Sequence, residues 1–353
     1  MSNYPLVSAI VLCRNEEKFI GKCLDSIIAN DYPKEKLEIL VVDGMSEDRT
    51  REIVEKYRKD YQFIKLINNP KKLTPFAFNE GIRNSHGDLV MIMSAHATYG
   101  TDYIRKCASA SHKYNAENVV GIWKILPRGD GFIDKAIVLA LSSSFGVGNA
   151  KYRTASAKKK EAEYVDTGAY GCYKKDVFKK IGLFNENLNH SQDMEFNLRL
   201  KKAGGKTLLL PDTIVSYFAR TDFKSFCKHN FRNGVWAILP FKYTTVMPVS
   251  FRHLVPITFV SSLLISGILS LFLQIFIWPF LFIICSYSLC NIYFSTVIAA
   301  KKKGIKYFFM MPIIYSFLHI TYGLGSLWGL LKAVISKQFW KNRFSKSIVK
   351  ISV

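Results

Sequence analysis

The chain has 353 residues and a formal net charge of +22, which leaves room for one catalytic domain and an accessory region. All 27 Asp and Glu residues lie in residues 1–222, together with 34 Lys and Arg. Residues 223–353 contain 15 Lys and Arg and no acidic residue. Because the unopposed charge alternates with long apolar runs, it predicts contact with anionic lipid headgroups and excludes nucleic acid as the partner.

Short apolar runs alternate with amphipathic stretches in the first hundred residues. The strand-like runs are residues 6–12, 37–42 and 89–93, and the helical stretches are residues 16–29, 49–60 and 76–84. This alternation predicts an α/β fold, Rossmann-like, with a mostly parallel sheet that is covered by helices on both faces. Ligands of such sheets bind beyond the carboxyl ends of the strands.

Polar side chains stand at these predicted strand ends. They are Arg14, Asn15 and Glu16 after the first strand, Asp43 after the second, and Ser94 and His96 after the third. A carboxylate such as Asp43 can accept hydrogen bonds from a base or a ribose, although capping of the turn explains it slightly better. His96 can offer one imidazole to a metal, although a lone His is more often an ordinary hydrogen-bonded residue.

Residues 120–220 have a less regular pattern. It predicts three helices, at residues 133–140, 174–181 and 193–203, and one strand at residues 207–210. The basic stretch 146–160 is predicted to be a mobile loop. Asp193 stands near the start of the third helix, where it can act as a general base or as an N-terminal cap. Glu195 stands four residues before Arg199, a spacing at which the two side chains can simply pair.

Two apolar segments, residues 254–273 and 277–300, are each long enough to span about 30 Å of hydrocarbon. Arg252 precedes the first and three lysines follow the second, so the positive-inside rule places both flanks in the cytoplasm. The absence of a signal-peptide pattern at the N-terminus and of any CxxC pair agrees with a cytoplasmic first domain. A third apolar segment, 307–335, is either another span or a broken, re-entrant or interfacial helix, because a full span would place the basic tail outside.

We therefore expect a catalytic domain at residues 1–222, juxtamembrane interface helices at 223–253 and a transmembrane region with a basic tail at 254–353. Arg232 and Trp236 lie in the juxtamembrane part. Arg232 can neutralise a leaving diphosphate, but a lipid-facing Arg and an interfacial Trp would give the same pattern.

The order of these segments resembles the family 2 glycosyltransferases with a GT-A fold, over roughly the whole chain. The resemblance is carried by VSAIVLCRNEE at 7–17, LVVDGMSEDRT at 40–50, NEGIRNSHG at 79–87, GLFNE at 182–186, and residues 192–204 with Pro211. Within the family, the chain is similar to membrane-tethered succinoglycan-type exopolysaccharide glycosyltransferases, whose metal strand ends in Asp-Ala-His-Ala. This chain has Ser94 in the place of that Asp, so His96 is the only side-chain metal ligand that the resemblance supplies.

The resemblance implies an inverting glycosyltransferase at a cell (inner) membrane that uses a nucleotide-sugar, a UDP-sugar, with Mg²⁺ or Mn²⁺ held at His96. It makes Asp193 the catalytic base and Arg232 the cation at the leaving diphosphate. The nucleotide-binding residues would be Leu12, Arg14, Asn15, Glu16, Asp43 and Ser94. Those on the acceptor or interface side would be Gln192, Glu195 and Trp236. The implied acceptor is a membrane-associated, polyprenyl-linked glycan of polysaccharide or glycoconjugate biosynthesis, surrounded by membrane lipids.

Two alternatives to this function stay open. One is an enzyme that glycosylates polyprenyl phosphate itself. The other is a non-catalytic partner that binds a nucleotide-sugar or a lipid carrier, and Ser94 is the feature in its favour. The retained Asp43, Asp193 and Arg232 favour an enzyme.

Overall fold

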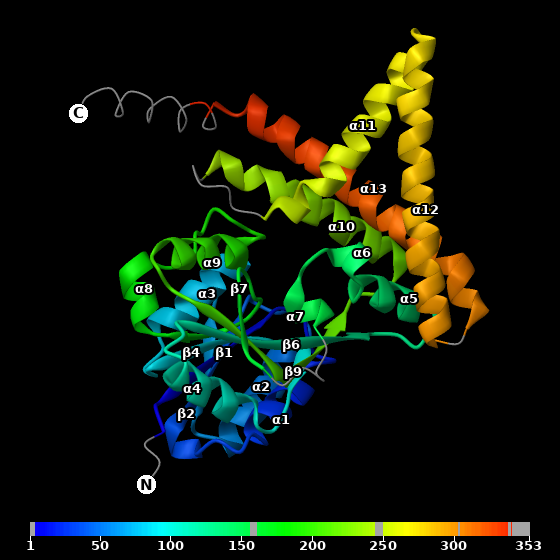
Figure 1. Cartoon of the computed structure of the whole chain (residues 1–353). Coiled ribbons are helices and arrows are strands. Elements are labelled where there is room, and N and C mark those ends of the chain that lie inside the picture. The colour runs from blue at the N-terminus through cyan, green and yellow to red at the C-terminus, as the bar shows by residue number, and fades with distance from the viewer. Residues whose placement is uncertain (1–3, 156–160, 244–249, 303, 338–339, 341–353) are drawn as a thin grey trace, which may run out of the picture. The chain divides into compact units, whose positions relative to one another are not determined.

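The structure is a computed structural model that describes residues 4–155, 161–243, 250–302, 304–337 and 340 (Figure 1). The chain divides into two compact units, the first of residues 1–126 and 150–218 and the second of residues 127–149 and 219–353. The chain thus leaves the first unit at Leu126 and returns to it at Ala150. The predicted basic tail lies outside the described residues except for Lys337 and Trp340, as does the lysine run 158–160 of the predicted loop.

One half of the sheet in the first unit is parallel. Its strands are β1 (Val7–Cys13), β2 (Leu37–Asp43), β3 (Ile64–Asn68) and β4 (Leu89–Ser94), in the order β3-β2-β1-β4. The three strands predicted in this region are confirmed, and β3 is an addition. The register aligns Cys13 with Asp43 and Leu12 with Ser94, so the residues that follow these strands share one edge of the sheet.

The other half of the sheet is antiparallel. Its strands are β5 (Ala97–Tyr99), β6 (Asn118–Pro127), β7 (Glu163–Val165), β8 (Cys172–Lys174) and β9 (Thr207–Ala219). Within the described residues the order continues from β4 through β8, β6 and β9 to β5, and β7 also pairs with β9. The α/β prediction is confirmed, but the sheet is mixed rather than mostly parallel, because these later strands pair antiparallel with their neighbours.

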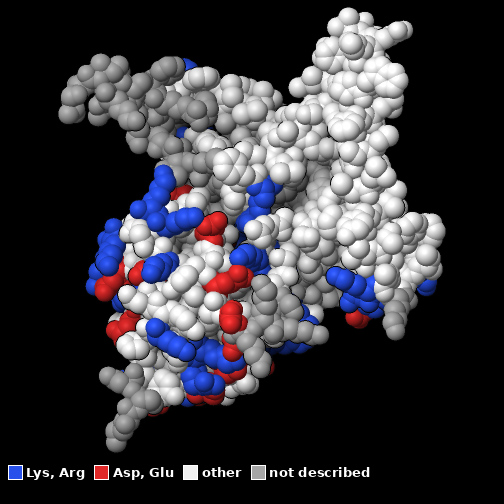
Figure 2. All heavy atoms as spheres, viewed as in Figure 1, with Lys and Arg blue, Asp and Glu red and all other residues white. Residues whose placement is uncertain are grey.

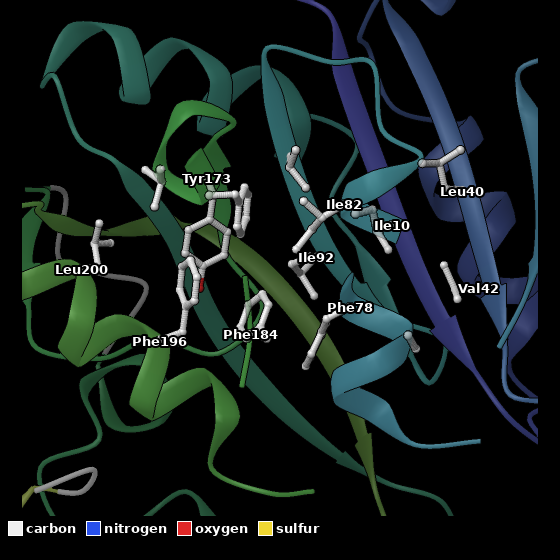
Figure 3. Close-up of a cluster of buried hydrophobic side chains, with 14 residues drawn as sticks. Ile10, Leu40, Val42, Phe78, Ile82, Ile92, Tyr173, Phe184, Phe196 and Leu200 are labelled. Atoms are coloured by element: carbon white, nitrogen blue, oxygen red, sulfur yellow. The ribbon is translucent and has the colours of Figure 1, made fainter. Parts of the chain in front are cut away.

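Helices surround this sheet (Figure 1). They are α1 (Ile20–Ile28), α2 (Thr50–Asp60), α3 (Thr74–Arg83), α4 (Tyr103–Lys113), α7 (Lys151–Thr154), α8 (Asp176–Ile181) and α9 (Gln192–Lys202), with a 3-10 turn η1 at Lys34–Lys36. In the core cluster of Figure 3, Ile10 and Leu40 come from the strands and Phe78 from α3. Phe184 stacks on Phe196 of α9 with ring centroids 4.4 Å apart, and burial of such a ring stabilises by about 1.5–3 kcal/mol.

The predicted helices of the middle region are confirmed, but the predicted loop is not. The helices are α5 (Phe132–Leu141), α8 and α9, and the strand predicted at residues 207–210 is the first part of β9. The described part of the predicted loop, 146–155, contains the end of α6 (Ser144–Val147) and all of α7. Gly148 between them has a φ of +59°, a conformation that L side chains rarely adopt, which explains why a glycine stands there.

The second unit is helical. It contains α5, α6, α10 (Phe223–Ile238), α11 (Val255–Ser270), α12 (Ile277–Lys302) and α13 (Ile305–Ile335), with 3-10 turns at Leu239–Lys242, Phe251–His253 and Gln274–Phe276. Glycines let α10 lie directly on α13: a Cβ at Gly234 would meet the carbonyl oxygen of Tyr322 at 2.0 Å, and one at Gly325 that of Phe231 at 2.0 Å. Such close backbone approach is typical of helices that pack inside membranes.

Three helices of the described chain are long and apolar enough to cross a membrane, at Phe251–Ser270, Gln274–Lys302 and Ile305–Ile335. The first two match the predicted spans. The third segment forms one continuous helix of 31 residues that accommodates Pro312, so within α13 there is no break. The surface of α11 and α12 is almost without charge, whereas Lys, Arg, Asp and Glu are spread over the first unit (Figure 2).

Candidate active site

Asp43 occupies the end of β2 as a buried, fully engaged carboxylate. Its side chain has no exposed surface. Nη1 of Arg51 lies 2.6 Å from its Oδ2, and the backbone N–H of Ser46 donates to the same oxygen at 3.0 Å. Asp43 therefore does cap the turn, as one of the two interpretations of the sequence predicted. The cap and the arginine also fix the carboxylate at the edge where a nucleotide is expected.

The turn after β1 is tied to the turn after β2 by hydrogen bonds in both directions. The backbone N–H of Asn15 donates to Oγ of Ser46 at 2.9 Å, and Oδ1 of Asn15 accepts from the backbone N–H of Glu47 at 2.9 Å. The next N–H, of Glu16, donates to Oγ1 of Thr50 at 2.8 Å. These bonds make the two turns one rigid unit, so the predicted nucleotide-binding residues Asn15 and Glu16 lie beside Asp43.

Leu12 and Arg14 flank this turn. Leu12 stands level with Ser94 of the neighbouring strand β4. Arg14 is exposed, and its side chain lies over Gly44, where an added Cβ would meet it at 3.2 Å. The structure thus brings together the residues predicted for nucleotide binding at the ends of β1, β2 and β4.

His96 pairs with Glu16, a contact that the sequence did not predict. Nδ1 of His96 lies 2.9 Å from Oε1 of Glu16, and Nε2 lies 3.1 Å from the hydroxyl oxygen of Tyr217 on β9. Ser94 is also buried, and its backbone N–H donates to the hydroxyl of Tyr99 at 2.8 Å. A carboxylate and an imidazole therefore stand side by side next to the position where Ser94 replaces an acid.

The donor set at this edge fits a divalent cation that is shared with a diphosphate. Among the described residues no three His, Cys, Asp or Glu side chains form a metal-binding group. Mg²⁺ and related ions commonly take only one or two carboxylates from the protein and the rest from substrate phosphates and water. Glu16 and His96 supply one carboxylate and one imidazole at adjacent positions. They are the residues that would hold such an ion.

Asp193 lies on α9, which several contacts hold against the sheet. Phe196 and Leu200 of this helix are in the core. The side-chain amide of Asn197 donates to the carbonyl oxygen of Gly168 at 2.9 Å, and its Oδ1 accepts from the side chain of Asn118 at 3.0 Å. These contacts fix the middle of the helix, so Asp193 in its first turn has a defined position.

Gln192 and Glu195, the neighbours of Asp193 on α9, differ in their side-chain contacts. Glu195 pairs with Arg199, whose Nε lies 2.7 Å from its Oε1, as the spacing of four residues predicted. Arg199 also donates to the carbonyl oxygen of Leu183 at 2.8 Å, so this pair anchors the helix. Gln192 is buried, and its Oε1 has no hydrogen-bond partner among the described residues. A role of Glu195 and Gln192 toward an acceptor stays a prediction.

Burial raises the pKa of the Asp193 carboxyl above its ordinary value, while the N–H of Met194 and the cation of Arg153 oppose this shift. Tyr170 interacts with both Ser94 and Asp193. Its hydroxyl shares a hydrogen bond with the side chain of Ser94 and feels the charge of Asp193, and burial raises the pKa of Tyr170 far above its usual value. A carboxyl with a raised pKa next to the sheet edge suits proton transfer.

Aromatic rings form a continuous stack between these groups. Trp123 of β6 stacks on Tyr217 with ring centroids 4.4 Å apart and on Tyr170 with centroids 5.5 Å apart. Tyr217 in turn meets the ring of His96 at 5.0 Å. No motif in the sequence marks these aromatic residues. The signal that was available is the alternation of inward-facing positions along β6 and β9, which becomes readable only once the strands are assigned.

Four non-glycine residues at the turns of this site have a left-handed backbone. Asn15, Met45, Tyr170 and Ser191 have φ values of 54°, 56°, 52° and 60°. Such conformations cost energy and persist only where the surroundings enforce them, and they are frequent at functional sites. Asn15 and Met45 lie two residues beyond the ends of β1 and β2, and Ser191 directly precedes α9.

Arg232 and Trp236 lie on α10, which belongs to the second unit. Burial and the neighbouring Arg220 lower the pKa of Arg232. Nη2 of Arg232 lies 3.1 Å from Nδ1 of His229. A part for Arg232 and Trp236 in the site of the first unit stays a prediction.

Known proteins with similar sequences identify the family of this chain. The model of the family described as Glycosyl transferase family 2 matches residues 8–182. A relative from Methanococcus voltae, named dolichyl N-acetyl-alpha-D-glucosaminyl phosphate 3-beta-D-2,3-diacetamido-2,3-dideoxy-beta-D-glucuronosyltransferase, is 33% identical over 233 residues, which are 65% of this chain and 71% of the relative. The chain belongs to glycosyl transferase family 2.

Other members and a solved structure agree with this assignment. The succinoglycan biosynthesis protein ExoA of Rhizobium meliloti is 25% identical over 259 residues, which are 69% of this chain and 76% of that protein. The mannosyltransferase PcManGT from Pyrobaculum calidifontis, solved with GDP-Man and Mn²⁺, has a TM-score of 0.56 at 17% identity and covers 93% of this chain and 88% of its own. The predicted family and the GT-A type of fold are confirmed, and the chain is a glycosyltransferase.

Proposed function

We propose that this family 2 glycosyltransferase transfers a sugar, with inversion, from a UDP-sugar to a polyprenyl-linked glycan at a membrane. The observation that carries the proposal is the chain of contacts from the Glu16–His96 pair through Tyr217 and Trp123 to Tyr170. Tyr170 in turn feels the charge of Asp193. Together these interactions connect a place for a leaving diphosphate with a carboxyl that can act as a base, as a displacement at an anomeric carbon requires.

The nucleotide end of the reaction is assigned to the parallel half of the sheet. Asp43 accepts hydrogen bonds from the nucleoside, and the rigid turn at Asn15 orients it. Glu16 and His96 would hold Mg²⁺ or Mn²⁺, and a cation bound there would supply Lewis-acid stabilisation of the leaving oxygen. For Arg232 we keep the role that the sequence predicts, neutralisation of the leaving diphosphate.

Asp193 acts at the other end of the reaction. Its ionised carboxylate takes the proton from an acceptor hydroxyl while the hydroxyl oxygen forms a bond to the anomeric carbon. The bond from that carbon to the diphosphate oxygen breaks, and UDP leaves with the electron pair. Because attack and departure occur on opposite faces, the anomeric configuration inverts. Burial moves the pKa of Asp193 toward neutral pH, and a general base works best when its pKa is near the operating pH.

The acceptor class rests on the relatives and on the second unit. The Methanococcus voltae relative is named for transfer of a glucuronosyl sugar to a dolichyl-linked N-acetylglucosaminyl phosphate. We infer an acceptor of the same kind here, and a donor that is either a neutral UDP-sugar or a UDP-uronate. The three candidate spans support a multi-pass inner-membrane protein. Arg252, Lys301 and Lys302 favour cytoplasmic flanks for α11 and α12, and hence a cytoplasmic catalytic domain.

The test is turnover by the full chain in detergent. A panel of nucleotide-sugars is offered with and without Mn²⁺, with sugar-bearing polyprenyl diphosphate, bare polyprenyl phosphate or no lipid as acceptor. Release of UDP that needs the metal and the sugar-bearing lipid supports the proposal. Equal turnover with bare polyprenyl phosphate would make the lipid phosphate itself the acceptor. Nucleotide binding without turnover of any donor would favour the non-catalytic alternative that Ser94 suggests.

A further inference from the structure

Arg153 is a cation of the first unit that no step above uses. It stands on α7, a helix of four residues in a region that the sequence predicted to be a loop. Its guanidinium carbon lies 5.7 Å from the ring centroid of Trp123 and 5.5 Å from that of Tyr152. Arg153 therefore lies on the same aromatic stack that runs from His96 through Trp123 to Tyr170.

The guanidinium of Arg153 is incompletely satisfied within the described chain. Its Nε is buried and has no hydrogen-bond partner among the described residues. The second cation of α7 contrasts with it, because Nζ of Lys151 lies 2.6 Å from Oε2 of Glu163. A buried donor of a charged group is costly to leave unpaired, so a site that keeps one is a site prepared for an anionic oxygen.

The position of Arg153 restricts where that oxygen can come from. Asp193 acts electrostatically on Arg153, and Arg153 in turn lowers the pKa of Asp193. On the other side, Trp123 leads to Tyr217 at 4.4 Å and Tyr217 to His96 at 5.0 Å. A donor with its diphosphate at His96 and its anomeric carbon before Asp193 therefore passes along the stack that Arg153 covers.

On the basis of the proposed function, we propose that Arg153 binds an anionic oxygen pair of the donor. Two parts of a nucleotide-sugar carry this chemistry, the diphosphate and, in a UDP-uronate, the carboxylate at C6 of the sugar. The planar guanidinium matches either group with two parallel N–H bonds, which an ammonium cannot do. Arg153 is then a substrate-binding residue that sets either donor affinity in general or the preference for acidic donors.

The experiment is isothermal titration of the full chain in detergent with three probes: UDP, UDP-N-acetylglucosamine, and the 6-carboxylate of that sugar nucleotide. The two sugar nucleotides differ only at C6. The variants are Arg153→Gln and Arg153→Lys, and Lys151→Gln is the matched control because it removes the other cation of α7. Thermal melting confirms that each variant is folded.

The outcomes separate the two sources. If Arg153 binds the sugar carboxylate, Arg153→Gln weakens the binding of the acidic donor by about 10- to 100-fold. The affinities for UDP and for the neutral donor then stay unchanged. If Arg153 binds the diphosphate, the affinities for all three probes fall by a similar factor. In both cases Arg153→Lys recovers only part of the affinity, and Lys151→Gln binds as the wild type does.

Two results would overturn the inference, and they are distinguishable. If the wild-type chain binds all three probes and folded Arg153→Gln binds them equally well, Arg153 only supports the aromatic stack, and the proposed function stands without it. If the wild-type chain binds none of the probes, the UDP-dependent function itself fails, together with everything that rests on it.

Discussion

The two halves of the sheet hold their functional carboxylates in different ways. Asp43, in the parallel half, is fully buried and held by Ser46 and Arg51, which follow it within eight residues. Asp193 stands on α9, which Asn197 bonds to Asn118 of the antiparallel half. Asp193 is surrounded by groups that are distant in the sequence, such as Arg153 and Tyr170, and its pKa is raised by burial. The first arrangement favours a fixed acceptor of hydrogen bonds, and the second favours a group that exchanges a proton.

The largest effect that this comparison predicts is on turnover in Asp193→Asn. The amide cannot take the acceptor proton, so kcat should fall by about 10²- to 10⁴-fold, while the Kd for UDP stays unchanged because the parallel half is intact. UDP release with lipid acceptor and calorimetric titration measure the two quantities. Asp176→Asn is the control, since Asp176 also stands in a first helical turn but is exposed and pairs with the exposed Lys179. Turnover near that of the wild type would remove Asp193 from the role.

The opposite pattern is expected for Asp43→Asn. Loss of a charged acceptor should weaken UDP binding by about 10- to 100-fold, with a far smaller change in kcat at saturating donor. Titration with UDP and donor-saturation kinetics give the two values. Because Arg51 loses its partner, thermal melting must accompany them, and Asp25→Asn serves as a control carboxylate on α1 that is bonded to Tyr57. Unchanged UDP affinity would break the division of labour between the two halves.

A smaller effect is expected at the junction of the halves, where Glu16 meets His96. Glu16→Gln should weaken Mn²⁺ binding in the presence of UDP by about tenfold, because one of two protein ligands is lost. The electron paramagnetic resonance signal of free Mn²⁺ measures this without any turnover. Glu17→Gln, next in the chain, is the matched control. An affinity equal to that of the wild type would show that Glu16 only orients His96.

The smallest predicted effect is a shift in pH dependence. Asp193 works as a base only when it is deprotonated, so kcat should fall as the pH drops through its raised pKa, at a pH above about 3.9, the usual value for aspartate. Arg153→Gln removes a cation that lowers this pKa, so the acid limb should move to higher pH. Lys151→Gln should leave the limb in place. A limb that moves to lower pH in Arg153→Gln would contradict the electrostatic relation between the two residues.

The same comparison explains how much the sequence could predict. The parallel half is encoded locally: β1, β2 and β4 are short apolar runs, and Asn15 and Asp43 follow them directly. Their positions at one edge follow from the rule that parallel strands end at the same side. The first turn of α9 was also predictable, because its helical pattern is local.

The antiparallel half depends on contacts that no local pattern reveals. The stack of Trp123 on Tyr217 joins β6 to β9 across about ninety residues of chain, and the pairing of Glu16 with His96 joins two turns separated by 80 residues. Arg153 stands in a basic, small-residue stretch whose composition is typical of a loop, and only its position beside Trp123 gives it a possible function. These side chains become candidates only when the fold is known.

The most direct test of the account is the anomeric configuration of the product. Nuclear magnetic resonance of the lipid-linked glycan made from an α-linked UDP-sugar distinguishes the two possible outcomes through the coupling of the anomeric proton. A single displacement assisted by Asp193 predicts a β-linked product that is not formed by Asp193→Asn. An α-linked product would contradict the account, because retention requires a different sequence of steps and leaves no place for Asp193 as the base of a single inverting transfer.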